Sequence, residues 1–347
     1  MRRLSRIAVA GIASATLAVT ASACGSSSSS SSSDSEGKGL ALAYDVGGKG
    51  DQSFNDAATA GMDKADAEFG YKSTAVEPQD GESDADKAQR LEQLAKQGYN
   101  PVIGVGYAYA PAVKEVAAKF PKVTFGVVDD EQVQADNVAD MVFTEEQASY
   151  LAGVTAALTT KTNVVGFVGG VDIPLIHKFE AGYKQGVEDT KKGVTVKSQY
   201  LTETAQEGGF SSPDKGESAA EGMIDAKADV VYAAAGLSGQ GVIKAAAANK
   251  VWAIGVDSDQ YKQDALAKYK DSILTSAMKD VAGAVYNLAK SVEDGKPETG
   301  VVRADLASGG VSLADSNPVF KDNAELQAAL KKAEDGIKDG SIKVKTS

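Results

Sequence analysis

Cysteine, histidine and tryptophan each occur only once in this chain of 347 residues. A single cysteine, Cys24, excludes a disulfide within the chain, and it excludes a zinc site built from cysteine and histidine ligands. A nucleophilic mechanism with a histidine base would have to use His177, in the segment IPLIHKFEAG. We interpret His177 as an ordinary surface or core side chain, and we expect no catalytic residue, no metal site and no cofactor.

Basic side chains are outnumbered by acidic ones, 36 to 48, which gives a formal net charge of -12. This balance argues against nucleic acid or an anionic membrane surface as the main partner, because both attract positive charge. It says little about a neutral small ligand. Hydrophobic residues make up 43% and charged residues 24%, as in a soluble globular protein, and the length suffices for two domains.

The N-terminal apolar run, residues 7–19, is too short to span a bilayer as a stable helix. Arginines precede it and small residues follow it, which is the pattern of a secretory signal peptide. We therefore predict that residues 1–23 are a signal peptide.

Cys24 directly follows these small residues, an arrangement that resembles the lipobox of bacterial lipoproteins. The alternative is an ordinary signal peptide that is cut nearby, with the cysteine incidental. Eight serines at 26–33 form a flexible tether that cannot build a core, and we assign residues 24–37 to the lipidated cysteine and this tether. Two lipid chains would hold the protein stably at the outer, extracytoplasmic face of the cell membrane.

From residue 39 onward, short apolar runs alternate with segments of helical periodicity. The runs predict strands at 39–46, 101–106, 122–128, 137–143, 163–169, 195–201, 228–234, 251–257 and 272–278. Helices are predicted at 53–69, 83–97, 111–120, 145–160, 215–227 and 239–250, and Ser83 with Asp86 is a start signal for the second of these. Repeated βα units imply parallel sheets that helices cover on both faces. Because the units are too many for one sheet, we predict an α/β protein of two doubly wound lobes.

In doubly wound sheets, ligands bind beyond the carboxyl ends of the strands. The side chains expected there include aromatic rings, isolated carboxylates, amides and one lysine: Asp45, Asp51, Ser53, Phe54, Asn55, Tyr107, Asp129, Asp130, Asp172, Phe210, Asp257 and Lys279, together with Gly236. Aromatic rings that stack on a flat ring, with carboxylates accepting from its NH and OH groups, suit a base or a sugar. Any one aspartate could instead cap a helix, and any one glycine could form a turn. The set as a whole predicts a site for a polar small molecule.

Nucleotide-binding motifs do not fit the glycine-rich segments. In GGKGDQS, Gly50 follows Lys49 where a P-loop requires serine or threonine. The segment GLSGQG at 236–241 is not G-x-G-x-x-G, so it gives no support to dinucleotide binding. No clustered acidic signature of a metal-dependent nucleoside hydrolase is present either.

The segment DVGGKGDQSFN at 45–55 is similar to the pattern D-x-G-G-x-x-D-x-S-F-N of a known family. Further similar segments occur in order at 137–153, 179–186, 210–216, 254–260, 274–281 and 309–314. On these segments, the chain from about residue 39 onward resembles the basic membrane protein family of bacterial lipoproteins. This family, also called the purine nucleoside receptor family, supplies substrate-binding components of ABC transporters.

The resemblance implies the type I periplasmic-binding-protein fold, in which the chain crosses three times between two lobes. It places these hinge crossings near residues 143, 257 and 307. We therefore expect an N-terminal lobe of residues 38–142 plus 258–306. The C-terminal lobe would comprise residues 143–257 plus 307–347.

The resemblance also implies how a purine would be held. Phe54 and Phe210 match the aromatic rings that enclose the base. Asp45, Asn55 and Asp129 match positions near the base edge, and the next aspartate, 130, is the alternative if the match shifts by one.

The ribose hydroxyls would be held by Asp257 and Lys279, and Gly236 matches a backbone contact. Two positions depart from the family pattern: Gly50 stands where an acid is frequent, and Ser212 stands where an aspartate is common. These departures affect the preference among ligands more than the fold.

The sequence thus predicts a monomeric solute-binding protein that captures a purine nucleoside (adenosine, guanosine or inosine), closes its lobes and presents the ligand to an ABC permease. Three alternatives stay open. The first is a binding protein or sensor for another ligand, such as a sugar or signalling molecule. The second is a nucleoside-cleaving enzyme, which product formed from inosine would identify. The third is a sensor or adhesin without a role in transport.

Overall fold

The computed structural model describes residues 38–79 and 81–347. The predicted signal peptide, the lipidation at Cys24 and the serine tether lie outside these residues. Within the described part, the strands form two six-stranded sheets. None of the helices there combines the length and the apolar character that a membrane span needs.

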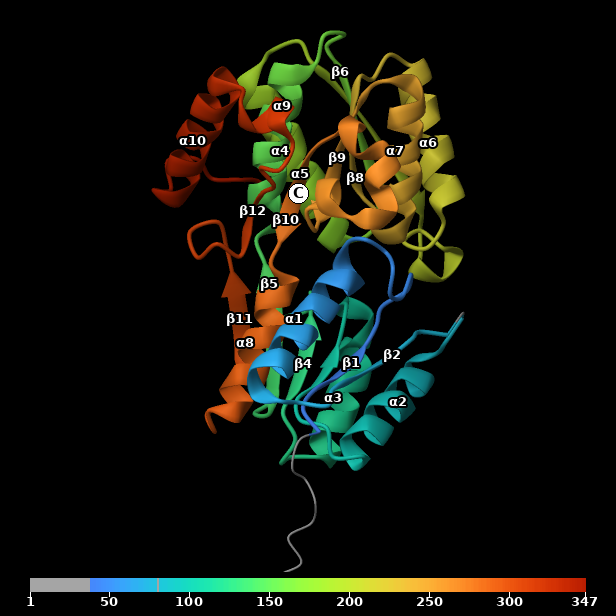
Figure 1. The fold of residues 1–347 in the computed structure, drawn as a ribbon, viewed down its shortest axis with the longest axis vertical. Helices are drawn as coiled ribbons and strands as arrows, with labels where there is room; N and C mark the ends of the chain where they lie inside the picture. The colour runs from blue at the N-terminus through green and yellow to red at the C-terminus, as the bar shows by residue number, and fades with distance from the viewer. Residues whose placement is uncertain (1–37, 80) are drawn as a thin grey trace, which may run out of the picture. The chain divides into compact units, whose positions relative to one another are not determined.

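The first sheet has the strand order β11-β5-β4-β3-β1-β2, and all of its neighbouring strands are parallel. Its strands are β1 (Ala41–Ala43), β2 (Thr74–Val76), β3 (Val102–Gly104), β4 (Phe125–Val128), β5 (Val138–Phe143) and β11 (Gly300–Ala304). Its helices are α1 (Phe54–Phe69), α2 (Asp84–Lys96), α3 (Ala110–Lys119) and α8 (Val281–Glu293). We call this unit the first lobe. Figure 1 shows that α8 and β11, coloured orange as late segments, lie among the blue and green elements of this lobe.

The second sheet has the order β12-β10-β9-β8-β6-β7, in which only β12 is antiparallel to its neighbour. Its strands are β6 (Val164–Val171), β7 (Thr195–Thr202), β8 (Val230–Ala234), β9 (Trp252–Asp257), β10 (Ile273–Lys279) and β12 (Val311–Leu313). The helices α4 (Glu145–Thr159), α5 (Pro174–Thr190), α6 (Pro213–Asp225), α7 (Gly239–Asn249), α9 (Pro318–Lys321) and α10 (Ala324–Lys338) complete the second lobe. The predicted α/β class and the two doubly wound sheets are thus confirmed.

Every strand predicted from an apolar run is present, but β2, β11 and β12 were not predicted. All three lie at the edges of their sheets. Interior strands such as β3, β4 and β5 are fully buried and therefore appear as continuous apolar runs. β11 alternates between half-buried and exposed residues, so its sequence GVVRA carries a weaker signal.

The start of α2 follows the sequence signal. The Ser83 hydroxyl accepts from the backbone N–H of Asp86, and the Asp86 carboxylate accepts from the backbone N–H of Ser83. This reciprocal pair is a capping box, which satisfies two of the N–H groups that a helix start leaves without a partner.

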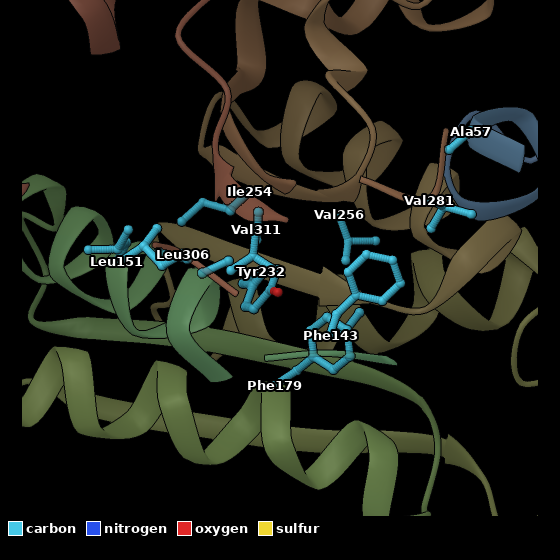
Figure 2. Close-up of a cluster of buried hydrophobic side chains, with 14 of the residues drawn as sticks. Ala57, Phe143, Leu151, Phe179, Tyr232, Ile254, Val256, Val281, Leu306 and Val311 are labelled. Carbon is cyan, nitrogen blue, oxygen red and sulfur yellow. The ribbon is translucent and has the colours of Figure 1, made fainter. Parts of the chain in front are cut away.

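One large hydrophobic cluster continues from the first lobe into the second. Figure 2 shows Phe143 from the end of β5 beside Phe179 from α5 and Val256 from β9. Val281, at the start of α8, belongs to the same cluster. The ends of both sheets are therefore packed against one apolar interior where the chain passes between them.

The assignment of residues 258–306 to the first lobe needs a correction. β10 pairs with β9 on one side and with β12 on the other, so residues 273–279 belong to the second sheet. Only α8 and β11 return to the first lobe. The apolar run of β10 is almost wholly buried, and the second sheet provides the neighbours that cover it. The chain therefore passes between the lobes after β5, after β10 and between β11 and β12.

Candidate functional site: a cleft between the carboxyl ends of two sheets

A cavity lies where the carboxyl ends of the two sheets face each other, with about 520 Å³ of empty space that is partly open to solvent. Its lining contains every residue that the family resemblance assigns to the ligand: Asp45, Phe54, Asn55, Asp129, Phe210, Gly236, Asp257 and Lys279. It also contains Val46, Asp51, Tyr107, Leu175, Ile176, Phe179, Ala234, Ala235 and Val256. Of the larger set expected beyond the strand ends, Ser53, Asp130 and Asp172 are absent from the lining. Residues from widely separated parts of the chain thus meet at one place, as the doubly wound topology requires.

The two aromatic rings come from different lobes. Phe54 is the first residue of α1 in the first lobe, and Phe210 lies in the loop between β7 and α6 of the second. Gly170 leaves room for the Phe210 ring, because a Cβ at that position would overlap it. The cavity therefore has a flat apolar surface from each lobe.

The cation of the site is Lys279, which is 4% exposed. Its Nζ lies 2.7 Å from Asp129 Oδ2 and 3.8 Å from Asp257 Oδ1, and it lies 4.6 Å from the centre of the Phe54 ring. Burial favours the neutral amine, but the carboxylates of Asp129, Asp257 and Glu145 outweigh this effect and raise the pKa of Lys279 above its ordinary value. Lys279 is therefore positively charged at neutral pH.

Carboxyl groups outnumber amino groups around this lysine. Glu145, at the start of α4, is buried behind the cavity, and its second cationic neighbour, Lys178, is 3.8 Å away and 29% exposed. Burial raises the pKa of Glu145 and of Asp257, although Lys279 opposes both shifts. A ligand that donates hydrogen bonds would relieve this excess of buried acceptors.

Two carboxylate oxygens in the lining have no hydrogen-bond partner among the described residues: Asp129 Oδ1 and Asp257 Oδ1. The other oxygen of each is held, since Asp129 Oδ2 accepts from Lys279 and Asp257 Oδ2 accepts from Ser53 Oγ at 2.7 Å. A buried acceptor without a partner is costly, so such atoms point to the donors of a ligand. Both aspartates also have left-handed backbone, with φ of 68° and 61°.

The Asp45 side of the cavity is held by a local network. Asn55 Oδ1 accepts from the backbone N–H of Asp45 at 3.0 Å, and Asn55 Nδ2 donates to Asp51 Oδ2 at 3.1 Å. Burial raises the pKa of Asp45 to about 7, while a hydrogen bond from the Val46 N–H opposes the shift. Gly106 makes space for this carboxylate, which a Cβ would overlap. Asp45 can therefore offer either an acceptor or a donor near neutral pH.

The structure also shows where Asp130 and His177 lie. Asp130, the alternative to Asp129, is absent from the cavity lining. His177 lies outside the cavity, where its Nε2 is 2.6 Å from Asp172 Oδ1 and its side chain is 40% exposed. No group of three or more histidine, cysteine, aspartate or glutamate side chains in the described ranges is arranged to hold a metal ion.

The predicted binding set missed the apolar wall formed by Leu175, Ile176 and Phe179. These residues occupy the first turns of α5, which begins at Pro174 after β6. A helix that follows a parallel strand begins near the carboxyl edge of the sheet, and proline favours the first position of a helix. Pro174 is therefore the sequence signal that could have located this wall.

Known proteins with the same arrangement identify the class. The chain is similar to a solved solute-binding protein of an ABC transporter system from Aeropyrum pernix K1, with a TM-score of 0.77 and 27% identity over 89% of this chain and 94% of that one. A solute-binding protein from Conexibacter woesei shares the fold, with a TM-score of 0.71 and 22% identity over 89% and 99% of the two chains. Fold and cleft together define a solute-binding protein of the type I periplasmic class.

Residues 39–346 match the family described as ABC transporter substrate-binding protein PnrA-like. The chain is 35% identical to the ABC transporter nucleoside-binding protein BmpA of Lactococcus lactis, over 97% of this chain and 98% of that protein. It is also 35% identical to the CD4+ T-cell-stimulating antigen of Listeria monocytogenes, over 88% and 87% of the two chains. The protein belongs to this Bmp family of ABC-transporter substrate-binding proteins, which bind their substrates rather than transform them.

Proposed function

We propose that this protein binds purine nucleosides in the cleft between its lobes and delivers them to an ABC permease for uptake. The observation that carries the proposal is the pair of buried carboxylate oxygens without partners, Asp129 Oδ1 and Asp257 Oδ1, in a cavity with one phenyl ring from each lobe. A nucleoside supplies what both features need, namely hydroxyl and N–H donors on a flat aromatic ring.

The charges at the cleft favour a neutral ligand that is rich in hydroxyls. Lys279 is already paired with Asp129, and the carboxyl group of Asp257 lies 3.8 Å from the same Nζ. A phosphate group would face these carboxylates at close range, so a nucleoside suits the site better than a nucleotide. Hydroxyl and N–H groups of a nucleoside that donate to Asp257 and Asp129 would satisfy the free acceptors without adding charge.

The aromatic residues support a base as the second part of the ligand. Phe54 belongs to the first lobe and Phe210 to the second, so a purine between them would contact both lobes when they approach. Base stacking on an aromatic side chain contributes about 1–3 kcal/mol. The relative named as a nucleoside-binding protein is consistent with this ligand class.

The proposed function also includes an anchor at the N-terminal part of the chain. Cys24 would carry the lipid anchor, and residues 24–37 would tether a monomeric receptor at the outer face of the membrane. Cys24→Ser should move the protein from the membrane fraction to the soluble fraction without changing the affinity for its ligand. Membrane retention of this variant would contradict the anchor.

Calorimetric titration of the protein tests the ligand. After removal of copurified ligand by unfolding and refolding, the purified chain would be titrated with adenosine, guanosine, inosine, uridine and ribose. We expect one-to-one binding of at least one purine nucleoside, and Phe54→Ala and Phe210→Ala should each weaken it about tenfold or more. No heat with any purine nucleoside, from protein whose circular dichroism shows it to be folded, would overturn the proposal.

A further inference from the structure

Ser53 lies at the position before the first residue of α1, where a serine ordinarily caps the helix with its own side chain. Here its φ of -146° and ψ of -108° are unusual for a cap, and its hydroxyl makes no cap hydrogen bond. Asp51 provides the cap instead, because its carboxylate accepts from the backbone N–H groups of Ser53, Asn55 and Asp56 at 2.8–3.1 Å. The Ser53 hydroxyl is therefore available for another contact.

That contact crosses from one lobe to the other. Ser53 Oγ, in the first lobe, donates to Asp257 Oδ2 at 2.7 Å in the second, and it lies 3.2 Å from the carbonyl oxygen of Val256. The Ser258 hydroxyl donates back to the Ser53 carbonyl oxygen at 2.7 Å. Ser53 is fully buried and does not line the cavity, so it touches the carboxylate from behind.

The hydrogen bond from Ser53 divides the roles of the two Asp257 oxygens. Oδ2 is held by the hydroxyl of the opposite lobe, while Oδ1 has no hydrogen-bond partner in the described part of the chain. Lys279 Nζ, 3.8 Å from Oδ1, is too distant for a hydrogen bond. A hydroxyl that donates to a carboxylate forms a strong, directional bond, which fixes the plane of the carboxylate and therefore the direction of Oδ1.

We propose that Ser53 is a positioning residue for ligand recognition: by holding Asp257 Oδ2 across the cleft, it aims Asp257 Oδ1 at a ligand hydroxyl when the two lobes are together. This inference rests on the proposed function, since it takes a nucleoside as the ligand. It follows that one lobe completes an acceptor that belongs to the other. Recognition of the sugar hydroxyls is then linked to closure, and an open form binds them less well.

The test compares a purine nucleoside with its 2′,3′-dideoxy analogue, which lacks the sugar hydroxyls of interest. For the unmodified protein, the dissociation constants of both compounds give a discrimination ratio. Ser53→Ala should weaken binding of the nucleoside about tenfold and change binding of the dideoxy analogue much less, so the ratio falls about tenfold. Ser149→Ala is the matched control, because it also removes a buried hydroxyl. The Ser149 hydroxyl lies 3.1 Å from the Tyr232 hydroxyl, and neither residue lines the cavity. It should leave the ratio unchanged.

The outcomes separate this inference from the proposed function. If the unmodified protein binds no purine nucleoside, the proposed function itself fails. If it binds and Ser53→Ala weakens both compounds equally, or neither, then Ser53 has only a structural role and the inference is wrong. A Ser149→Ala variant that lowers the ratio as much as Ser53→Ala would also overturn it.

Discussion

The two lobes share one strand order, and the site depends on a pair of corresponding strands whose end residues differ. Apart from the direction of the last strand, the sheets have the same order, so β4 corresponds to β9 and β5 corresponds to β10. Asp129 directly follows β4 and Asp257 ends β9; both have left-handed backbone and one carboxylate oxygen without a partner. Equivalent positions thus provide one acceptor from each lobe.

The ends of β5 and β10 differ in the same comparison. β5 ends at the apolar Phe143, whereas β10 ends at Lys279, the cation that neutralises acceptors of both lobes. The shared strand order therefore places an acceptor at equivalent positions of the two lobes, and the lysine at the end of β10 makes their burial tolerable. The two lobes therefore differ in the charge at the end of these corresponding strands, and substitutions at the site can test the consequence of that difference.

Removal of the cation should have the largest effect. Lys279→Met leaves Asp129, Asp257 and Glu145 buried without their shared partner, which should lower the free energy of unfolding by about 3–5 kcal/mol. Urea unfolding of the purified variant measures this. Lys178→Met, at a partly exposed position 3.8 Å from Glu145, should cost about 1 kcal/mol or less. Equal losses for the two lysines would show that Lys279 has no special role.

The two equivalent acceptors should matter to a similar extent for the ligand. Asp129→Ala and Asp257→Ala should each weaken nucleoside binding about 10- to 100-fold, because each removes a buried charged acceptor. Asp130→Ala is the control, since this neighbour is absent from the cavity lining, and its affinity should be unchanged. Titration calorimetry distinguishes these cases. A strong effect at only one of the two positions would break the symmetry of the acceptors.

The partly buried carboxyl of Asp45 should make the stability of the unliganded protein depend on pH. Its folded-state pKa of about 7 lies above the unfolded value, so the folded state holds a proton that the unfolded chain releases. The free energy of unfolding should therefore fall as pH rises from 5 to 8, by at most about 1.4 kcal/mol per pH unit from this group. Asp45→Asn should reduce this slope, to which Asp51 and Glu145 also contribute, and Asp136→Asn, at an exposed site, should leave it unchanged. Denaturant unfolding at several pH values measures both, and parallel slopes for the variants would contradict the assignment.

The smallest expected effect concerns two serines that precede corresponding helices. Ser83 caps α2 in the first lobe, but Ser212 makes no side-chain cap to α6 in the second. Ser83→Ala should destabilise the protein by about 1 kcal/mol, and Ser212→Ala by a few tenths at most. Thermal or urea unfolding can resolve the difference. A loss of stability at Ser212 as large as that at Ser83 would contradict this difference between the two helix starts.

The sequence predicts the interior of both sheets better than their edges. β3, β4 and β9 are buried on both faces, so their apolar runs are unbroken, whereas β11 has one exposed side and depends on pairing with β5 from far along the chain. For the same reason the sequence places the second crossing near residue 257, whereas the chain leaves the second lobe only after β10, which ends at Lys279. Local composition does not predict which distant segments pair as strands.

The site was predictable where residues follow strands directly. Asp45, Asp129 and Asp257 lie at strand ends, and parallel topology brings such positions together. The role of Ser53 was not predictable, because the preference of serine for helix starts hides its contact with the opposite lobe. Local patterns thus locate the cavity, but its cross-lobe hydrogen bonds require the folded structure.

A crystal structure of the protein with a bound purine nucleoside tests the central claim most directly. We expect the base between Phe54 and Phe210, and a ligand donor within hydrogen-bond distance of Asp129 Oδ1 and of Asp257 Oδ1. One ligand would then satisfy an acceptor from each lobe. A nucleoside bound elsewhere, or bound in the cleft with both oxygens still without partners, would contradict this account.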